Sequence, residues 1–374
     1  MNIYKKEIYH LAAVKLVKTL VTFKVGNLVI LFTSPIGLGH ATRDIAICEE
    51  LKSLTKENLL VITGRPAYDI FSNNGYNVID VYSPENFDIG RSMQLRSPLT
   101  WLFKYFMYYR RCKLTATGFI NEDKDSLIVS DEDFASIAVG EKKNRKRVLI
   151  TDLLETHFVN GLFSSIESRM NKSMQNMLKK CDRVLIPDNG EDKDNISYVG
   201  PIVRNLSTTD RILLRKKLGI DRRTILVCIG GTNAGLYLIK KALNAYKNLT
   251  IKMDLDLLVA LGPSVSEFEN NHINYRNIGF VYNLHEYVYA SDLVVSLAGR
   301  STIDESLVYG TPGIFIPIKD HFEQEQNAKK LGYKYEDISR LETLIEEKIT
   351  TGRMNKLHIN NGAKSAAKII NEMI

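Results

Sequence analysis

The sequence predicts an α/β protein built from two Rossmann-like, doubly wound domains that face a cleft. Short apolar runs rich in β-branched residues alternate with helix-like segments, and this alternation starts again in the second half of the chain. The length of 374 residues supports two domains, because a domain commonly has roughly 150 residues. Each half is therefore expected to form its own parallel sheet.

The first half contains six segments that read as strands. They are NLVILFTS, NLLVITG, YNVIDVY, SLIVSD, RVLITD and RVLIP. Helix-like stretches such as ATRDIAICEELKSL and FSSIESRMNKSMQNMLKK separate them, as in a parallel sheet. We predict an N-terminal acceptor domain over residues 1–203, with residues 1–26 as an extension before the first strand.

The second half repeats the pattern after YVGPIVRNL. Its strand-like segments are TILVCIGG, LDLLVALG, NIGFV, DLVVSLAG and PGIFIPI. Helical segments again lie between them, so we predict a C-terminal nucleotide-sugar-binding domain over residues 204–354. Residues 355–374 are expected to form a C-terminal helix that packs back on the first domain.

Composition narrows the classes of protein. The net charge of +7 and the pI near 9.0 favour an anionic partner. The four cysteines are widely spaced without a CxxC pair, which indicates neither a zinc site nor a disulfide framework and suits a reducing cytoplasm. No apolar run approaches the roughly 20 residues that span a bilayer, and no secretory signal is apparent. We therefore expect a cytoplasmic protein that does not cross a membrane.

The stretch SPIGLGHATRD joins the first strand to a helix and is the first candidate site. Ligands of open parallel sheets bind beyond the carboxyl ends of the strands, where a glycine turn lets backbone N–H groups approach them. Gly37 and Gly39 supply such a turn, and Arg43 follows on the acceptor side. His40 is expected in the first helical turn, where a neutral imidazole can take a proton from a hydroxyl. Alternatively, it only caps the helix.

Two further glycine turns follow strands of the second half. In CIGGTNAG, a pyrophosphate would be cradled by Gly230, Gly231 and Thr232. In SLAGRSTIDES, Gly299 begins the turn and Glu305 lies one or two turns into the helix, where its carboxylate can accept both hydroxyls of a ribose. The alternative for Glu305 is a solvated helix glutamate.

The C-terminal segments GPIVR, GGTNAG, GFVYNLHEYV and SLAGRSTIDESLVYGTPGIFIPIKDHFEQEQNA together resemble the nucleotide-sugar-binding domain of GT-B glycosyltransferases. The resemblance is strongest to the MurG-type lipid-linked N-acetylglucosaminyltransferases and their archaeal and eukaryotic relatives of N-glycan assembly. It covers most of the chain and is strongest over residues 200–328. GLGHATRDIAICEEL is similar to the Gly-His loop of uncharacterised archaeal and bacterial GT-B members.

The resemblance implies roles for individual residues. Glu305 would hold the ribose, the backbone of Phe280 and Val281 would pair with uracil, and Arg204 would lie near the donor pyrophosphate. His40 matches the proposed general base. The remaining donor-site positions are Gly230, Gly231, Thr232, Gly299, Ser301, Thr302, Glu323 and Gln324, the last two at the donor sugar. The sequence departs from the family in the shortened loop of residues 36–39 and in Arg300, which weakens the assignment of the acceptor most.

The expected reaction needs no metal and no cofactor. A hydroxyl of a lipid-linked or other glycan acceptor would displace UDP from a UDP-sugar, best N-acetylglucosamine, with inversion at the anomeric carbon. A rival reading is the triplet of Asp131, Glu132 and Asp133, a D-x-D arrangement by which other transferases hold a metal. Asp152 is a second catalytic candidate on the acceptor side, or else a carboxylate that caps the next helix.

The segment Pro98–Lys113 interleaves aromatic and basic residues. Such a helix suits the interface of an anionic membrane, which would make the enzyme peripheral at the cytoplasmic face; alternatively, it is a core helix with a basic end. Two other functions stay open: a UDP-sugar 2-epimerase of the same architecture, and a basic nucleic-acid-binding protein, although no nucleic-acid-binding module is recognisable. The sequence gives no oligomeric state.

Overall fold

The computed structural model describes residues 28–122, 125–152, 154–157, 164–231, 233–265, 268, 273–353 and 360–374. Residues 1–26, expected as an extension, lie outside this part of the chain. The chain forms two compact units. The first consists of the described residues through Asn86, Pro98–Ile202 and Asn361–Ile374, and the second of Phe87–Ser97 and the described residues of Val203–Asn360.

A seven-stranded parallel sheet forms the centre of the first unit. The strand order is β3-β2-β1-β6-β7-β8-β9. The strands are β1 (Leu28–Thr33), β2 (Asn58–Gly64), β3 (Val78–Tyr82), β6 (Leu127–Asp131), β7 (Arg147–Ile150), β8 (Arg183–Ile186) and β9 (Ile196–Tyr198).

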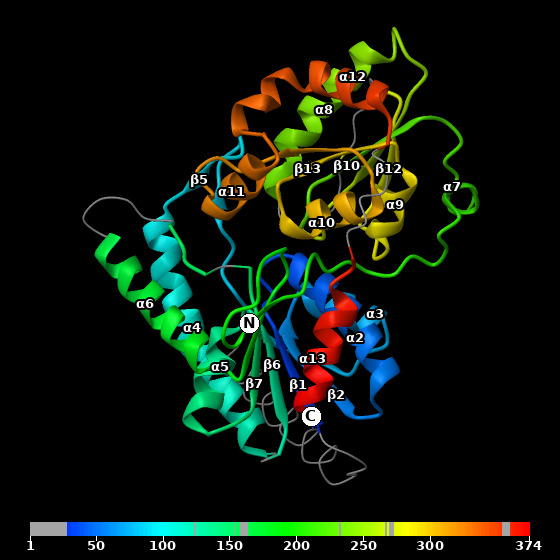
Figure 1. Cartoon of the computed structure of the whole chain (residues 1–374). Coiled ribbons are helices and arrows are strands. Elements are labelled where there is room, and N and C mark those ends of the chain that lie inside the picture. The colour runs from blue at the N-terminus through cyan, green and yellow to red at the C-terminus, as the bar shows by residue number, and fades with distance from the viewer. Residues whose placement is uncertain are drawn as a thin grey trace. The chain divides into compact units, whose positions relative to one another are not determined.

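Helices cover both faces of this sheet (Figure 1). On one face lie α2 (Gly39–Leu54), α3 (Ala67–Asn73) and α13 (Ala363–Met373), and on the other lie α4 (Pro98–Glu122), α5 (Phe134–Lys142) and α6 (Ser164–Lys180). Alternate residues of β1 explain the two layers. Ile30 and Phe32 pack in the same core cluster as Phe119 of α4, whereas their neighbours Val29 and Leu31 are buried outside that cluster.

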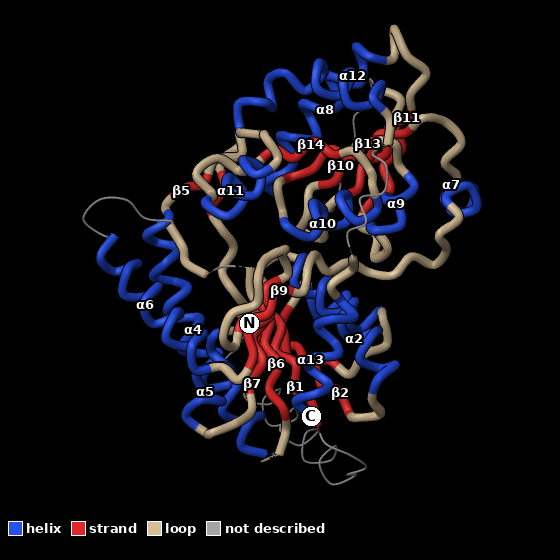
Figure 2. Tube along the Cα trace, viewed as in Figure 1, coloured by secondary structure: helices blue, strands red, loops and turns tan. Residues whose placement is uncertain are grey.

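The second unit contains a five-stranded parallel sheet in the order β12-β11-β10-β13-β14, again between helices (Figure 2). Its strands are β10 (Thr224–Cys228), β11 (Asp256–Ala260), β12 (Arg276–Gly279), β13 (Leu293–Leu297) and β14 (Gly313–Ile316). Its helices are α7 (Arg211–Leu218), α8 (Leu236–Leu249), α9 (Leu284–Ala290), α10 (Arg300–Tyr309), α11 (Phe322–Lys330) and α12 (Leu341–Thr351), with two 3₁₀ helices, η2 (Asn233–Gly235) and η3 (Tyr335–Arg340).

The two faces of β10 belong to two different hydrophobic clusters. Ile225 and Val227 pack with α8 and α12, whereas Leu226 and Cys228 pack on the opposite side with α7 and α9. A strand that is buried on both faces reads as a continuous apolar run, as TILVC does. The prediction of two Rossmann-like, doubly wound domains is confirmed.

A short hairpin crosses from the first half of the sequence into the second unit. It consists of β4 (Asp88–Ile89) and β5 (Leu95–Arg96), which pair antiparallel. Met93 is fully buried in the second unit's core, and the N–H of Lys319 donates to the Met93 carbonyl at 2.9 Å. The predicted domain boundary at residue 203 assigned residues 87–97 to the first domain. Nothing in this polar stretch of sequence indicates that Met93 packs in the core of the second unit.

The C-terminal helix α13 packs against α2 in the first unit. Its buried face consists of small residues and one isoleucine, Ala363, Ala366, Ala367 and Ile370. The N–H of Gly362 donates to the Pro201 carbonyl at 2.8 Å, which fixes the start of the helix. Among the described residues, no helix has the length and apolar character needed to cross a membrane.

Candidate active site

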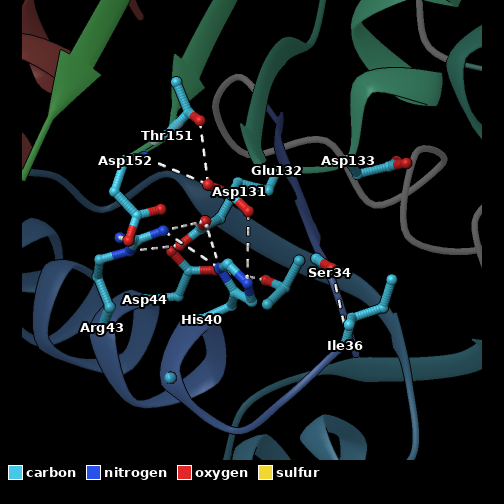
Figure 3. Close-up of polar contacts among 12 residues, drawn as sticks. Ser34, Ile36, His40, Arg43, Asp44, Asp131, Glu132, Asp133, Thr151 and Asp152 are labelled. Atoms are coloured by element: carbon cyan, nitrogen blue, oxygen red, sulfur yellow. Dashed lines mark hydrogen bonds and ion pairs between the residues drawn. The ribbon is translucent and has the colours of Figure 1, made fainter. Parts of the chain in front are cut away.

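The first candidate site lies where the strand order of the first unit reverses. The chain passes from β1 to its neighbour β2 on one side, whereas β6 pairs with β1 on the other. Ligands of doubly wound sheets bind at such switch points, beyond the carboxyl ends of the strands. The loops after β1, β6 and β7 meet at this edge, and each contributes polar side chains (Figure 3).

The glycine turn after β1 directs the chain into α2. Gly37 has a φ of +87°, a left-handed conformation that favours glycine. Gly39 begins α2, and His40 follows in the first turn. The position of His40 at the start of this helix agrees with the sequence analysis, whereas its partners come from β6, 91 residues further along the chain.

Both ring nitrogens of His40 face carboxylates. Its Nδ1 lies 2.9 Å from Oδ1 of Asp131, and its Nε2 lies 3.6 Å from Oε2 of Glu132. The side chain of Asp131 is fully buried, whereas 17% of the His40 side chain and 12% of that of Glu132 are exposed. His40 is therefore held from both sides, and the pair with Glu132 is the part that solvent reaches.

Arg43 anchors Asp131 from one helical turn further on. Its Nε donates to Oδ2 of Asp131 at 2.8 Å, and its Nη2 donates to Oδ1. Two parallel bonds of this kind fix a carboxylate in both position and orientation. The Nη1 atom also lies 3.7 Å from Oδ2 of Asp152, so the predicted residues Arg43 and Asp152 lie in the same cluster as His40.

The charges of this cluster shift its pKa values. Burial alone would lower the pKa of His40, but Asp131 and Glu132 raise it to about 9, so the imidazole is protonated at neutral pH. Burial would raise the pKa of Asp131, but Arg43 and His40 outweigh it and lower that pKa. Asp131 is thus the permanent anion of the cluster.

Glu132 occupies an uncommon backbone conformation. Its φ is +53°, in the left-handed region that long side chains rarely adopt. Its Oε1 accepts hydrogen bonds from the Thr151 hydroxyl at 3.0 Å and the Asp152 N–H at 3.2 Å. Burial and the nearby Asp152 raise the pKa of the Glu132 carboxyl well above its usual value. Sequence analysis had considered this residue only as part of a metal motif.

The three carboxylates of the D-x-D triplet serve separate partners. Asp133 turns away from Asp131 (Figure 3), accepts a hydrogen bond from the Tyr82 hydroxyl at 2.9 Å and caps the N-terminus of α5. Within the described part of the chain, no group of three or more His, Cys, Asp or Glu side chains is arranged to hold a metal ion. The arrangement of the triplet therefore gives the metal reading no support.

The second candidate site lies at the corresponding switch point of the other sheet, between β10 and β13. After β10, Gly230 has a φ of +66°. A Cβ atom on Gly262 would lie 2.1 Å from the Gly230 carbonyl oxygen, so the loop after β11 packs tightly on this turn. The Ser264 hydroxyl donates to the Gly231 carbonyl at 2.8 Å. Thr232, the third residue of the predicted cradle, lies outside the described residues.

The loop after β13 leads into α10. Gly299 is its N-cap residue, and Ser301 and Thr302 lie in its first turn, where helical N–H groups point toward the carboxyl edge of the sheet. Glu305 is buried one turn later, and burial raises its pKa to about 8, against the opposing charge of Arg204. A solvated helix glutamate would not be buried, so the structure disfavours that alternative.

Arg204 is tied to the segment that follows β12. Its Nη1 donates to the Tyr282 carbonyl at 2.9 Å, and its own carbonyl accepts from the Tyr309 hydroxyl at 2.7 Å. The predicted uracil-binding residues Phe280 and Val281 directly precede Tyr282. The second unit therefore brings Arg204 to both this segment and the helix that carries Glu305.

Glu323 and Gln324 lie in the first turn of α11. The side-chain oxygen of Gln324 accepts from the Ile318 N–H at 3.1 Å, which holds the preceding loop against the helix, and Glu323 is half-buried. The ring of Phe87 from the hairpin segment lies 5.2 Å from that of His321 in the same loop.

Comparison with known proteins identifies the enzyme class. Residues 224–373 match the glycosyltransferase family 28 C-terminal domain. An uncharacterized glycosyltransferase of Methanopyrus kandleri is 26% identical over 65% of this chain and 74% of its own length. The UDP-N-acetylglucosamine–N-acetylmuramyl-(pentapeptide) pyrophosphoryl-undecaprenol N-acetylglucosamine transferase of Desulforamulus reducens is 30% identical over 47% of this chain and 53% of its own length.

Solved structures give the same fold. The glycotransferase of kitacinnamycin matches with a TM-score of 0.64 at 12% sequence identity, over 94% of this chain and all of its own. These comparisons confirm a GT-B-fold glycosyltransferase that resembles the MurG-type enzymes. The roles of individual residues remain predictions.

Proposed function

We propose that this glycosyltransferase moves N-acetylglucosamine from a UDP-sugar to a hydroxyl of a lipid-linked glycan, with inversion at the anomeric carbon and without a metal ion or cofactor. The name of the Desulforamulus reducens relative supports the donor and the type of acceptor. The observation that carries the proposal is that the two switch points bear different groups. The one in the second unit has glycine turns and the buried Glu305, and the one in the first unit has the titratable cluster around His40.

The second unit is proposed to bind the donor. The N–H groups around Gly230, Gly231 and the start of α10 suit the pyrophosphate, because glycine turns and helix N-termini present unshielded positive dipoles. Glu305 would bind the ribose hydroxyls, and Arg204 would balance the charge that grows on the leaving diphosphate. Phe280, Val281, Glu323 and Gln324 keep their predicted roles at the uracil and the donor sugar.

The first unit is proposed to supply the proton acceptor. The acceptor hydroxyl loses its proton to the cluster around His40 while its oxygen bonds to the anomeric carbon. The bond from that carbon to the diphosphate oxygen breaks, and UDP leaves with the electron pair. A single displacement of this kind inverts the anomeric configuration. Gly37 shapes the loop beside the cluster, and Arg43 and Asp131 hold it in place.

Helix α4 is proposed to bind an anionic membrane surface. One of its faces is buried, with Tyr108, Cys112 and Phe119 in the core. The other face bears an exposed apolar stripe at helical spacing, Leu99, Phe103, Phe106, Met107 and Leu114, with exposed fractions of 42, 68, 50, 43 and 76%. Lys104, Arg110, Arg111 and Lys113 lie along the same helix. An apolar stripe among cations matches the interface of an anionic bilayer.

The separation of α4 into a buried and an exposed face refines the prediction for Pro98–Lys113. The aromatic residues of this segment lie in different environments: Tyr108 is buried and Tyr105 packs against the core, whereas Phe103 and Phe106 are exposed. A peripheral enzyme at the cytoplasmic face of the membrane, where a lipid-linked acceptor lies, is the localisation we propose.

Sedimentation with vesicles tests the membrane proposal. The wild type is expected to sediment with vesicles containing phosphatidylglycerol and to leave them as the salt concentration rises, because salt screens surface charge. Phe103→Ser with Phe106→Ser should abolish sedimentation. Ile212→Ser removes an exposed side chain from the second unit and is the matched control. Equal recovery of the wild type in the supernatant with and without vesicles would refute the proposal.

Incubation with UDP-N-acetylglucosamine tests the function. We expect UDP release that depends on vesicles containing a polyprenyl-diphosphate-linked N-acetyl sugar, with the label recovered in the lipid. Conversion of the sugar to its 2-epimer without an acceptor would instead identify an epimerase. Absence of both UDP release and UDP binding would refute the proposed donor.

A further inference from the structure

We propose that the carboxylate of Glu132, rather than the imidazole of His40, is the base that removes the proton from the acceptor hydroxyl, and that His40 acts as its fixed cationic partner. This inference rests on the proposed glycosyl transfer and names the atom that takes the proton. It follows from the geometry around the two ends of the His40 ring (Figure 3).

The ring of His40 has no nitrogen turned toward an open side. Its Nδ1 faces Asp131 at 2.9 Å, and its Nε2 faces Glu132 at 3.6 Å. An acceptor hydroxyl would have to approach the lone pair of Nε2, but a neutral Nε2 lone pair would point at a carboxylate oxygen. The arrangement is favourable only when Nε2 carries a proton, and a protonated Nε2 cannot accept another.

The charged groups that face His40 come from three places. Asp131 is the last residue of β6 and Glu132 follows it, and the guanidinium of Arg43 lies on the same helix as His40, with its Nη2 3.2 Å from Nδ1. Asp152, after β7, pairs with Arg43 at 3.7 Å, and Asp44 is bound to the Thr33 hydroxyl at 2.6 Å. The positive charge of Arg43 opposes protonation of His40, but Arg43 is itself paired with Asp131 through two hydrogen bonds. The two carboxylates prevail, and the pKa of His40 rises to about 9.

Glu132 has the features of a positioned base. Its Oε1 is held by the Thr151 hydroxyl and the Asp152 N–H, which leaves Oε2 on the side of His40. Its side chain is 12% exposed, so a hydroxyl can reach it. Glu132 has a left-handed backbone directly after β6, and its carboxylate faces His40 of α2. Burial and Asp152 raise its pKa well above the usual value, which favours proton transfer from an alcohol.

The step balances without any further reagent. The acceptor O–H bond breaks and its proton goes to Oε2 of Glu132, while the acceptor oxygen bonds to the anomeric carbon. The bond from that carbon to the diphosphate breaks, and the electron pair leaves with UDP. Before this step, the charge of His40 opposes burial and Asp152, which both favour the neutral form of Glu132. Afterwards, the proton passes to solvent at the exposed edge.

The pH dependence of the wild-type rate separates the two bases. With Glu132 as the base, kcat/KM for transfer from UDP-N-acetylglucosamine to the polyprenyl-linked probe should fall above about pH 9, where His40 loses its charge. With His40 as the base, the rate would rise about tenfold per pH unit up to about 9, because only the neutral imidazole accepts a proton. The latter profile would overturn the proposal.

Substitution of Glu132 gives the second test. Glu132→Gln keeps the shape of the side chain and should lower kcat by about 10²–10⁴-fold, the usual contribution of a general base. Glu132→Gly suits the left-handed backbone, and formate should restore part of its rate, because a small carboxylate can occupy the vacated place. Glu141→Gln makes the same chemical change at an exposed ion pair with Lys180 and is the control that should keep full activity. Activity of Glu132→Gln within a few-fold of the wild type, or no rescue by formate, would overturn the role.

The outcomes distinguish this inference from the proposed function. If the wild type neither binds UDP nor transfers the sugar, the proposed function fails. If the wild type is active and Glu132→Gln is equally active, only the role of Glu132 fails. Calorimetry should show that Glu132→Gln binds UDP as the wild type does, and NMR titration of the His40 ring should show a lower midpoint in this variant, because one of its two facing carboxylates is gone. An unchanged midpoint would contradict the geometry on which the proposal rests.

Discussion

Asp131 should be the residue of the first unit whose neutralisation costs most. It is fully buried and accepts hydrogen bonds from the Arg43 Nε at 2.8 Å and from Nη2, with the His40 Nδ1 at 2.9 Å. Asp131→Asn keeps the shape of the side chain but removes its charge. Two cations are then left facing one amide, and an amide cannot accept from all of their donors.

Two magnitudes follow from this geometry. Breaking a buried ion pair by removing one partner costs about 3–5 kcal/mol of the free energy of unfolding. The pKa of His40, raised from 6.5 to about 9 in the wild type, should fall back toward 6.5 because Asp131 is the largest of the groups that raise it. At about 1.4 kcal/mol per pKa unit, the full shift of His40 corresponds to about 3 kcal/mol, in agreement with the first magnitude.

Urea unfolding and NMR titration of the His40 ring measure the two effects. Asp133→Asn is the matched control: asparagine caps a helix about as well as aspartate, so this change should cost little and should leave His40 unchanged. The pH dependence has a definite sign. The stabilisation that comes from the raised pKa of His40 is complete below pH 6.5 and is lost as the pH rises through about 9. The difference in free energy of unfolding between the wild type and Asp131→Asn should therefore shrink over that range. A cost below 1 kcal/mol at pH 6, with His40 still titrating near 9, would refute this reasoning.

Three further predictions concern the second unit. Because the pKa of Glu305 is raised, the ligand-free fold should lose stability as the pH rises from 4.5 through about 8. Glu305→Gln should therefore have a higher melting temperature than the wild type at pH 9 and a similar one at pH 4. An equal difference in melting temperature at both pH values would contradict the raised pKa. Met93→Ala should cost about 2–5 kcal/mol in urea unfolding, because it empties a fully buried position, whereas the exposed Met107→Ala should cost little; similar costs for both would contradict the packing of the hairpin. Gly262→Ala places a Cβ 2.1 Å from the Gly230 carbonyl and should weaken UDP binding measured by calorimetry; wild-type affinity would exclude this turn from the donor site.

The fold was predictable because its signal is local. Most strands of the two sheets are short apolar runs that alternate with segments of helical periodicity, and such alternation specifies parallel pairing through its connections. The hairpin of residues 87–97 was not predictable, since its place in the second unit depends on long-range contacts, such as the burial of Met93 in that core and the backbone bonds with Lys319.

The candidate site was predictable in part. The glycines before α2 and the position of His40 at its start are visible in the sequence, because strand, turn and helix are contiguous there. Its pairing with Asp131 is not, because it requires β6 to lie beside β1, and strand order is set by packing over the whole sheet. For the same reason, the sequence showed Glu132 only as part of a rival metal motif and not as a partner of His40.

Helix α4 shows a third feature that the sequence alone does not predict, namely which of its faces is exposed. The sequence reveals aromatic and basic residues at helical spacing, but the exposed face is decided by which side the sheet covers. Tyr108 packs on the sheet side and Phe103 does not, although both fit the same pattern.

Calorimetric measurement of UDP affinity in two variants tests the central claim most directly, that the second unit binds the donor and the first supplies the proton acceptor. Glu305→Ala should weaken UDP binding by roughly 1–3 kcal/mol, because buried ribose hydroxyls lose their acceptor. His40→Ala should bind UDP as the wild type does, although its rate of transfer falls. Equal loss of UDP affinity in both variants, or wild-type affinity in Glu305→Ala, would contradict the division of roles between the two units.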